Sequence, residues 1–342
     1  MNVELTTEAF GPPTVRPPLD PEIVPAEAAL REVFDSLRPL GDATVAELRR
    51  FTSQSESEGV PGDETQDLTV GGLVRLQERQ VPGPAGAPDI TILIARPAVD
   101  AKASLPAFYH IHGGGMVCGD PETGLMMVLP YVAEGLAMAV SVGYRLAPEH
   151  PAPAQVEDCY AGLVWTAEHA QDLRIDLGRL IIVGGSAGGG LAAGTALMAR
   201  DRGFPTLSHQ VLIAPMLDDR FETHSSRMLE HEGSWNRSDN LYGWTAMLGE
   251  RRGAPGVSPY AAPARATDLG RLPRTYIEVG SAEGFRDECL AYAQRLSEAG
   301  VVVDLHMWGG GCHSFDVLAP HAAVSQACVA TRDEFIRREL EY

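Results

Sequence analysis

Residues 180–190 have the sequence LIIVGGSAGGG and lead into the alanine-rich run 191–199. The first four residues are apolar, which suits a strand buried on both faces of a sheet. The alanine-rich residues that follow favour a helix over 187–202. Between them, Gly184 and Gly188 flank Ser186 at two-residue spacing, and glycines tolerate the backbone conformations of a very tight turn. The stretch therefore predicts a strand, a sharp turn that projects the Ser186 hydroxyl, and a helix.

This strand–turn–helix pattern, Gly-x-Ser-x-Gly, is typical of a nucleophilic serine. A helix that begins at Ala187 directs its N-terminal N–H groups and dipole toward a developing oxyanion. The competing interpretation is a glycine-rich turn that binds a dinucleotide. That interpretation also requires an acidic residue about 20 residues further on, after the next strand, and the sequence lacks it.

A second glycine-rich motif lies upstream, where His112 is followed by the three glycines 113–115 directly after an apolar run. Consecutive glycines let backbone N–H groups approach an anion closely, as the tetrahedral intermediate of acyl transfer requires. A phosphate-binding loop is the alternative, but no P-loop lysine follows.

Outward from these motifs, short apolar runs alternate with helical patterns, which predicts an α/β fold with a mostly parallel eight-stranded sheet. The expected strands are 73–77, 90–95, 107–111, 137–144, 180–183, 210–213, 275–279 and 301–307. The expected helices between or after them are 125–134, 154–169, 187–202, 287–299 and 319–338.

Two regions stand outside this alternation. Residues 1–66 contain helical patterns at 23–37 and 43–51 and then a polar linker, whereas 67–342 carry the sheet. The segment 216–256 is too long for a simple connection between strands. We expect it to be a helical insertion over the carboxyl edge of the sheet, where open α/β sheets bind ligands.

The combination of motifs resembles the hormone-sensitive-lipase-like branch of the α/β-hydrolases. The matching segments are 112–115, 144–149 (YRLAPE), 150–158, the turn at Ser186, and 286–288 (RDE). The resemblance implies that Gly114, Gly115 and Ala187 supply oxyanion N–H groups, and that residues 1–66 and 216–256 combine into a helical cap. It also implies hydrolysis of short- to medium-chain acyl esters of small molecules.

The general base and the triad acid follow the serine, in the chain order expected for this fold. His313 lies after the last expected strand and is the predicted base; it takes the Ser186 proton and returns it to the leaving alcohol. Glu283 occupies the place where the family usually has Asp and is the predicted acid. Asp287 is the rival, although an acid in the first turn of a helix often only complements the helix dipole.

The substrate pocket is less well defined by local patterns. Four large side chains are candidates for its lining, with core packing as the alternative for each: Met116, Met126, Trp235 and Trp244. The sequence implies no metal ion and no organic cofactor.

The composition limits the classes of partner that we expect the protein to bind. The net charge of −19 and the absence of Lys/Arg clusters argue against nucleic acid and against anionic membranes. No apolar run reaches the ~20 residues of a membrane span, and residues 1–25 show no signal-peptide pattern. Five cysteines without metal or redox spacing suit a cytoplasmic protein.

The strand 301–307 is a candidate sheet edge, and family members are commonly homodimers, so we expect a homodimer.

Ester hydrolysis is the predicted function, but other chemistry fits the same triad. A lactonase, an amidase or a thioesterase would use the same residues, and a ligand-binding protein without turnover could share the fold. The presence of all three candidate triad residues favours an enzyme.

Overall fold

The computed structural model describes residues 11–52, 66–99, 103–230 and 232–341. Its eight strands are β1 (Val74–Val81), β2 (Ile90–Pro97), β3 (Leu105–Ile111), β4 (Met138–Gly143), β5 (Ile175–Gly185), β6 (His209–Ile213), β7 (Arg274–Gly280) and β8 (Val303–Trp308). They form one sheet in the order β1-β2-β4-β3-β5-β6-β7-β8. β1 and β2 are antiparallel to their neighbours, and the other six strands are parallel. The predicted fold class is confirmed.

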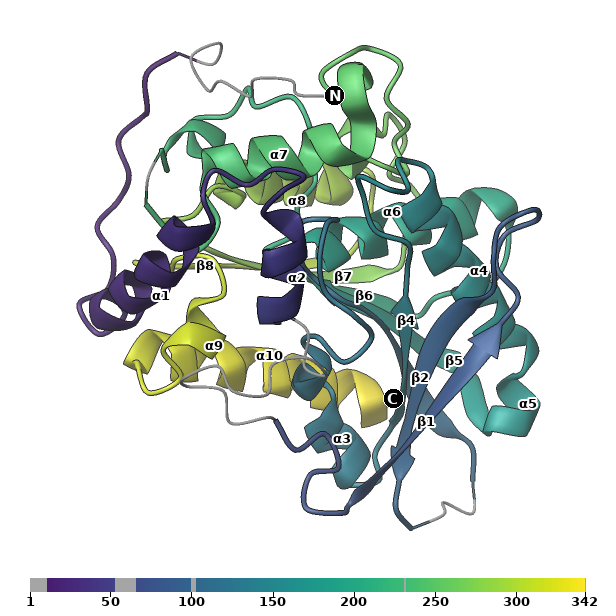
Figure 1. The fold of residues 1–342 in the computed structure, drawn as a ribbon. Coiled ribbons are helices and arrows are strands. Elements are labelled where there is room, and N and C mark those ends of the chain that lie inside the picture. Colours follow the sequence, from purple (N-terminus) through teal and green to yellow (C-terminus); the bar gives the residue numbers. More distant parts are fainter. Residues whose placement is uncertain (1–10, 53–65, 100–102, 231, 342) are drawn as a thin grey trace.

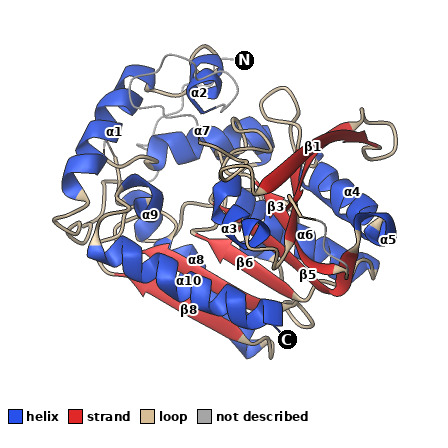
Figure 2. Ribbon diagram, turned by 90° about the horizontal axis from the view of Figure 1, so that it is seen from below, coloured by secondary structure: helices blue, strands red, loops and turns tan. Residues whose placement is uncertain are grey.

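Helices cover both faces of this sheet, as Figure 2 shows. The α-helices are α1 (Val24–Leu37), α2 (Val45–Thr52), α3 (Leu129–Ala133), α4 (Ala154–Glu168), α5 (Ala170–Leu173), α6 (Ala187–Arg202), α7 (Arg237–Leu248), α8 (Arg286–Glu298), α9 (Phe315–Leu318) and α10 (Ala323–Glu341). Short 3₁₀ helices are η2 (Leu125–Met127), η3 (Ser225–Arg227), η4 (Gly249–Arg251) and η5 (Pro263–Arg265).

Each face of the sheet buries its own apolar cluster. Tyr109 and Ile182 of β3 and β5 belong to the cluster that includes residues of α4, α6 and α8, whereas Phe108 and Ile181 belong to the cluster that includes residues of α3 and α10. Neighbouring residues of one strand thus enter different clusters, because side chains alternate between the two faces of a sheet. This two-sided burial explains why the central strands are continuously apolar.

The N-terminal helices and the 216–256 segment lie together at one end of the sheet, with α1 and α2 beside α7 (Figure 1). Arg38, just after α1, makes an ion pair of 2.7 Å with the fully buried Asp239 of α7. Glu27 of α1 accepts a hydrogen bond of 2.8 Å from the backbone N–H of Gly233. The central part of the expected linker, residues 53–65, lies outside the described residues.

Among the helices that the structure describes, none combines the length and the apolar character needed to cross a bilayer. All five cysteines are free and buried.

Candidate active site

Ser186 occupies the turn between β5 and α6, with φ +57° and ψ −125°. Few non-glycine residues adopt this backbone conformation, so the turn is strained. The neighbouring glycines make the turn sterically feasible. A Cβ on Gly184 would lie 2.3 Å from the carbonyl oxygen of Gly188, and one on Gly188 would lie 2.1 Å from that of Ile111. The Gly-x-Ser-x-Gly pattern therefore has a steric reason, and it presents the Ser186 hydroxyl at the carboxyl edge of the sheet.

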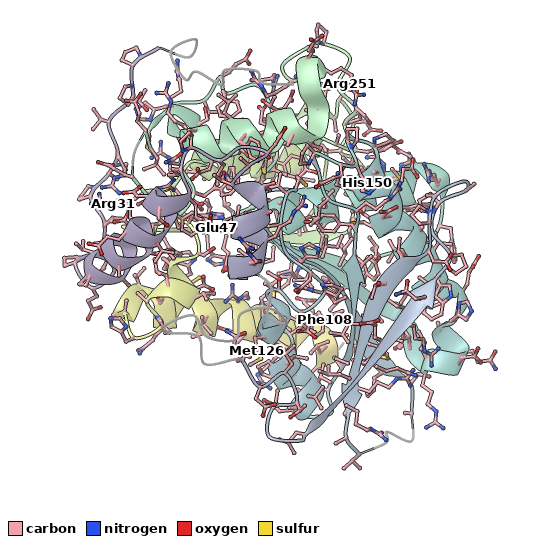
Figure 3. The ribbon with its side chains drawn as sticks, viewed as in Figure 1. Arg31, Glu47, Phe108, Met126, His150 and Arg251 are labelled. Atoms are coloured by element: carbon pink, nitrogen blue, oxygen red, sulfur yellow. The ribbon has the colours of Figure 1, made fainter. Side chains whose placement is uncertain are left out.

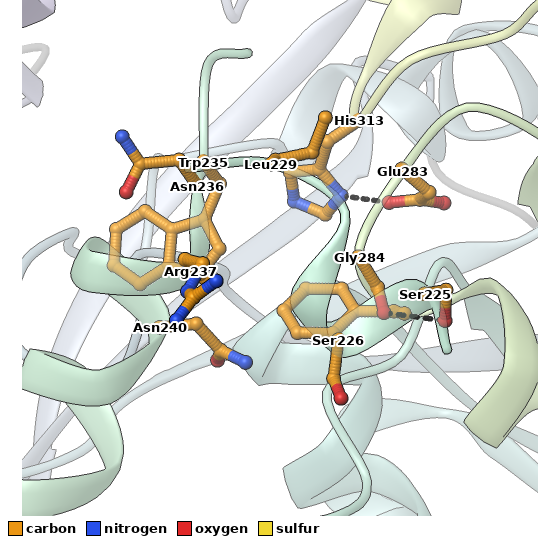
Figure 4. A pocket seen from close by; sticks show the side chains of 11 residues that line it. Ser225, Ser226, Leu229, Trp235, Asn236, Arg237, Asn240, Glu283, Gly284 and His313 are labelled. Atoms are coloured by element: carbon orange, nitrogen blue, oxygen red, sulfur yellow. Dashed lines mark hydrogen bonds and ion pairs between the residues drawn. The ribbon is translucent and has the colours of Figure 1, made fainter. Parts of the chain in front are cut away.

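His313 lies in the loop between β8 and α9 and contacts Ser186. Its Nε2 lies 2.9 Å from Ser186 Oγ, and its Nδ1 lies 2.5 Å from Glu283 Oε2. The Phe285 ring and the imidazole pack in a T-shaped arrangement with ring centroids 5.2 Å apart. Ser234 donates a hydrogen bond of 3.2 Å to the His313 carbonyl, so the 216–256 segment also supports this loop. Figure 4 shows the His313–Glu283 contact.

Glu283 follows β7 and is completely buried. Its other carboxylate oxygen accepts a hydrogen bond of 3.1 Å from the backbone N–H of Gly280. A buried carboxylate is costly without such partners, and here they aim it at the imidazole. The rival acid, Asp287, lies in the first turn of α8. It accepts a hydrogen bond of 2.8 Å from the Ser225 N–H and pairs with Arg286 at 2.7 Å. The structure thus brings Glu283, and not Asp287, to His313.

The glycine loop after β3 packs directly on the turn that carries Ser186. Gly114 and Gly115 have φ of +112° and +59°, which glycine adopts readily. A Cβ on Gly115 would lie 2.2 Å from the Trp235 ring. Within the described chain, no acceptor pairs with the backbone N–H groups of Gly114, Gly115 or Ala187. These three N–H groups are therefore without a hydrogen-bond acceptor in the part of the chain that the structure describes.

The residues around this loop hold it in place. Tyr144 donates a hydrogen bond of 3.0 Å to the His112 carbonyl, and its ring stacks on the His112 imidazole at 4.1 Å. Burial lowers the pKa of His112 to about 4, so this side chain is neutral at pH 7. The next residue, Arg145, forms a bidentate pair with the fully buried Asp158. The segment 144–149 therefore holds the glycine loop in position.

A cavity of about 570 Å³ opens over Ser186 and is bounded by the sheet edge, the glycine loop and the N-terminal helices. Met126 and Trp235 line it; Met126, labelled in Figure 3, lies in η2 beside α3. Met116 and Trp244 do not line it. Both are fully buried in the apolar core, which is the alternative that the sequence left open for them.

Sequence patterns missed several residues that the structure places at this cavity. Leu30, Phe34 and Leu48 reach it from α1 and α2. The charged residues Glu278, Asp316 and Arg332 line it as well. No local signal marks these residues, because they are far from Ser186 in the chain.

A second, much smaller cavity of about 10 Å³ lies behind His313 and Glu283 (Figure 4). It is lined by the 216–256 segment, including Trp235 and Asn240, and by residues that follow β7. Among the described residues there is no cluster of three or more His, Cys, Asp or Glu side chains that could hold a metal ion.

The fold, the strained serine and the two glycine motifs define an α/β-hydrolase. Residues 108–317 match the family model described as "alpha/beta hydrolase fold". The chain belongs to this family, in the hormone-sensitive-lipase-like branch that the motifs indicated.

Esterases are prominent among its relatives. The chain is 35% identical to esterase LipI of Mycobacterium tuberculosis over 241 residues, which are 68% of this chain and 72% of that protein. It is 34% identical to carboxylesterase NlhH of the same organism, over 68% of this chain and 72% of that one. The solved structure of a bacterial heroin esterase superimposes with a TM-score of 0.79 at 37% identity, covering 94% of this chain and 98% of that one. These relationships support ester hydrolysis as the reaction class of this enzyme, as predicted from the sequence.

Proposed function

We propose that the protein hydrolyses carboxylic esters of small molecules through an acyl-enzyme on Ser186, with His313 as general base and acid and Glu283 as the triad acid. The observation that carries this proposal is the continuous chain of contacts from Glu283 through His313 to Ser186 Oγ, below the cavity. Such a chain is the arrangement that activates a serine nucleophile.

The reaction then follows in two halves. Ser186 Oγ attacks the ester carbonyl carbon while His313 Nε2 takes its proton. The carbonyl oxygen becomes an oxyanion, which the N–H groups of Gly114, Gly115 and Ala187 stabilise. His313 next protonates the departing alkoxide, leaving an acyl group on Ser186. Water, deprotonated by His313, releases the carboxylic acid and restores the serine.

Glu283 keeps the His313 Nδ1–H pointed at its own carboxylate, so that Nε2 faces Ser186 as a proton acceptor. It also stabilises the imidazolium that forms in each half. Its negative charge is effective because the carboxylate is fully buried.

We assign α1, α2 and the 216–256 segment to a cap over a catalytic domain that begins near residue 67. The Arg38–Asp239 pair and the contact of Glu27 with Gly233 tie the two parts of this cap together. Arg49 of α2 donates hydrogen bonds to the carbonyls of Val117 and Ala147 beside the glycine loop. The cap thus closes the cavity without supplying the triad.

The cavity suits short- to medium-chain acyl esters. Its volume of about 570 Å³ lies within the ~300–1,000 Å³ typical of small-molecule sites. A lactone, an amide or a thioester could meet the same triad, and no contact in the structure favours one of them over an ester.

Two broader assignments belong to this proposal. The strand β8 ends the sheet and exposes Leu305 and Met307. An apolar sheet edge of this kind favours pairing, and we assign the protein to a homodimer formed along it. Light scattering at micromolar concentration tests this assignment, and a monomer would rule it out.

The five buried free thiols support a cytoplasmic location.

The test of the catalytic proposal is hydrolysis of p-nitrophenyl esters from acetate to laurate by the wild type and by Ser186→Ala. We expect turnover of the short esters by the wild type and its loss in the variant. Folded wild-type protein that turns over no ester in the series, or a variant that keeps full activity, would refute the proposal.

A further inference from the structure

A buried network of charged side chains joins three elements near the active site. Arg332 of α10 contacts Glu278 of β7 at 2.5 Å through one nitrogen and Asp316 of α9 at 2.8 Å through another. The Tyr276 hydroxyl also donates to Glu278, at 2.7 Å. The Glu278, Asp316 and Arg332 side chains are about nine-tenths buried or more. None of them takes part in the proposed reaction.

These three side chains line the same cavity as Ser186, so they form a charged end wall of the proposed substrate site. The sheet register places this wall relative to the serine. Gly185 is in register with Ile213, and Ile213 with Glu278. Two strand spacings separate Gly185 from Glu278, which is roughly 10 Å. A substrate chain of moderate length that runs from Ser186 along this side of the cavity therefore meets the end wall.

The end wall has hydrogen-bonding capacity left over. One oxygen of Asp316, Oδ2, accepts from Arg332, whereas no donor in the described part of the chain pairs with Oδ1. The formal charges of two carboxylates and one guanidinium leave one negative charge in excess. An alkyl chain end that displaces water here would leave Asp316 Oδ1 without a partner, and an unsatisfied buried acceptor is costly. A cationic donor that displaces the same water would instead donate a hydrogen bond to Asp316 Oδ1, and the excess negative charge would favour it.

We propose that the end wall of Glu278, Asp316 and Arg332 is a subsite for a protonated amine at the far end of an ester substrate. The amine donates to Asp316, and Arg332, held by Glu278, keeps that carboxylate in place. This inference rests on the proposed esterase function and specifies its substrate class. The enzyme prefers esters whose acyl or alcohol chain ends in an ammonium group over alkyl esters of equal length.

Matched probes test this preference in the full-length enzyme. In the acyl series, p-nitrophenyl 6-aminohexanoate is compared with p-nitrophenyl heptanoate, which has a methyl group in place of the ammonium. In the alcohol series, the acetate of 6-aminohexan-1-ol is compared with heptyl acetate. Hydrogen bonds to charged groups are worth at least about a tenfold effect. We expect kcat/KM to favour the amine at least about tenfold in one of the two series.

Two variants separate the subsite from a general effect of charge. Asp316→Asn keeps the shape of the side chain but removes the excess charge. We expect it to abolish the amine preference while p-nitrophenyl acetate turnover stays within about threefold of wild type. Asp333→Asn removes the same charge from the solvent side of α10, where Asp333 pairs with Arg337. It should leave the preference unchanged.

A measurement without any variant complements these. We expect n-heptylammonium to inhibit p-nitrophenyl acetate hydrolysis by wild type competitively, at a concentration at least about tenfold lower than heptan-1-ol requires. Equal inhibition, or equal kcat/KM for amine and alkyl probes in both series, would overturn the inference and leave the esterase function intact. An Asp316→Asn variant that slows acetate and amine esters equally would also overturn it, because the network would then only hold the His313 loop. Failure of the esterase function itself appears separately, as absent acetate turnover in wild type.

Discussion

Replacing Glu283 with glutamine tests the electrostatic core of the site while preserving its shape. Glu283 Oε1 accepts from the Gly280 N–H at 3.1 Å, and Oε2 faces His313 Nδ1 at 2.5 Å. When the glutamine oxygen keeps the Gly280 hydrogen bond, its NH₂ group faces Nδ1. His313 must then accept at Nδ1 and carry its proton on Nε2, where it can no longer deprotonate Ser186.

The expected cost follows from this wrong tautomer. In a serine triad an acid-to-amide change of this kind lowers kcat about 10⁴-fold, which corresponds to about 5.5 kcal/mol of transition-state stabilisation. Since the change removes a buried charge and adds no bulk, we expect the variant to fold. The assay is kcat for p-nitrophenyl acetate, with circular dichroism to verify folding.

The matched control is Asp287→Asn. Its side-chain oxygen still accepts from the Ser225 N–H, and only the partly exposed pair with Arg286 is lost. The expected change is a stability loss of at most ~1 kcal/mol, with kcat near that of wild type. A Glu283→Gln enzyme within tenfold of wild type, beside an inactive Asp287→Asn enzyme, would refute the assignment of Glu283.

Three further predictions address the surroundings of the triad. Gly115→Ala should lower kcat about 10²-fold, because the new Cβ collides with Trp235 and displaces an oxyanion donor; adding Trp235→Ala should restore part of the loss. Burial raises the pKa of Cys118 to about 11, so the thiol stays protonated below that pH. Labelling by a disulfide reagent should be slow at pH 7 and rise about tenfold per pH unit, and fast labelling at pH 7 would contradict this. Arg145→Ala leaves the buried Asp158 carboxylate unpaired, so urea denaturation should show a loss of about 3 kcal/mol; a loss below 1 kcal/mol would show that the pair is not structural.

Local patterns predicted the sheet well because each strand carries its own signal. Residues 180–183 are apolar and continuous, and they form the buried part of β5. The ends of the strands were predicted less accurately than their centres. β1 extends to Val81 although its outer residues are polar, because an edge strand needs only one buried face. The helix expected at 319–338 is α10, which starts at Ala323 after the separate turn of α9.

The pocket could not be predicted in the same way. Met116 and Trp235 are both large and apolar, and both adjoin the glycine loop, yet only Trp235 faces the cavity. Met116 has φ +70° and its carbonyl accepts a hydrogen bond from Ala147, which fixes it within the core. Whether a side chain faces a core or a cavity depends on what packs against it from elsewhere in the chain.

The sequence by itself determined the α/β architecture, the serine turn and the glycine loop, because strand periodicity and tight turns depend on residues only a few positions apart. Only the tertiary structure showed that Glu283 and Asp287, which are four residues apart, contact different partners: Glu283 contacts His313, and Asp287 contacts the Ser225 N–H. It alone also brought α1, α2 and the network of Glu278, Asp316 and Arg332 to the cavity. The physical reason is that burial and charge pairing join segments that are distant in the chain, and such contacts leave no local pattern.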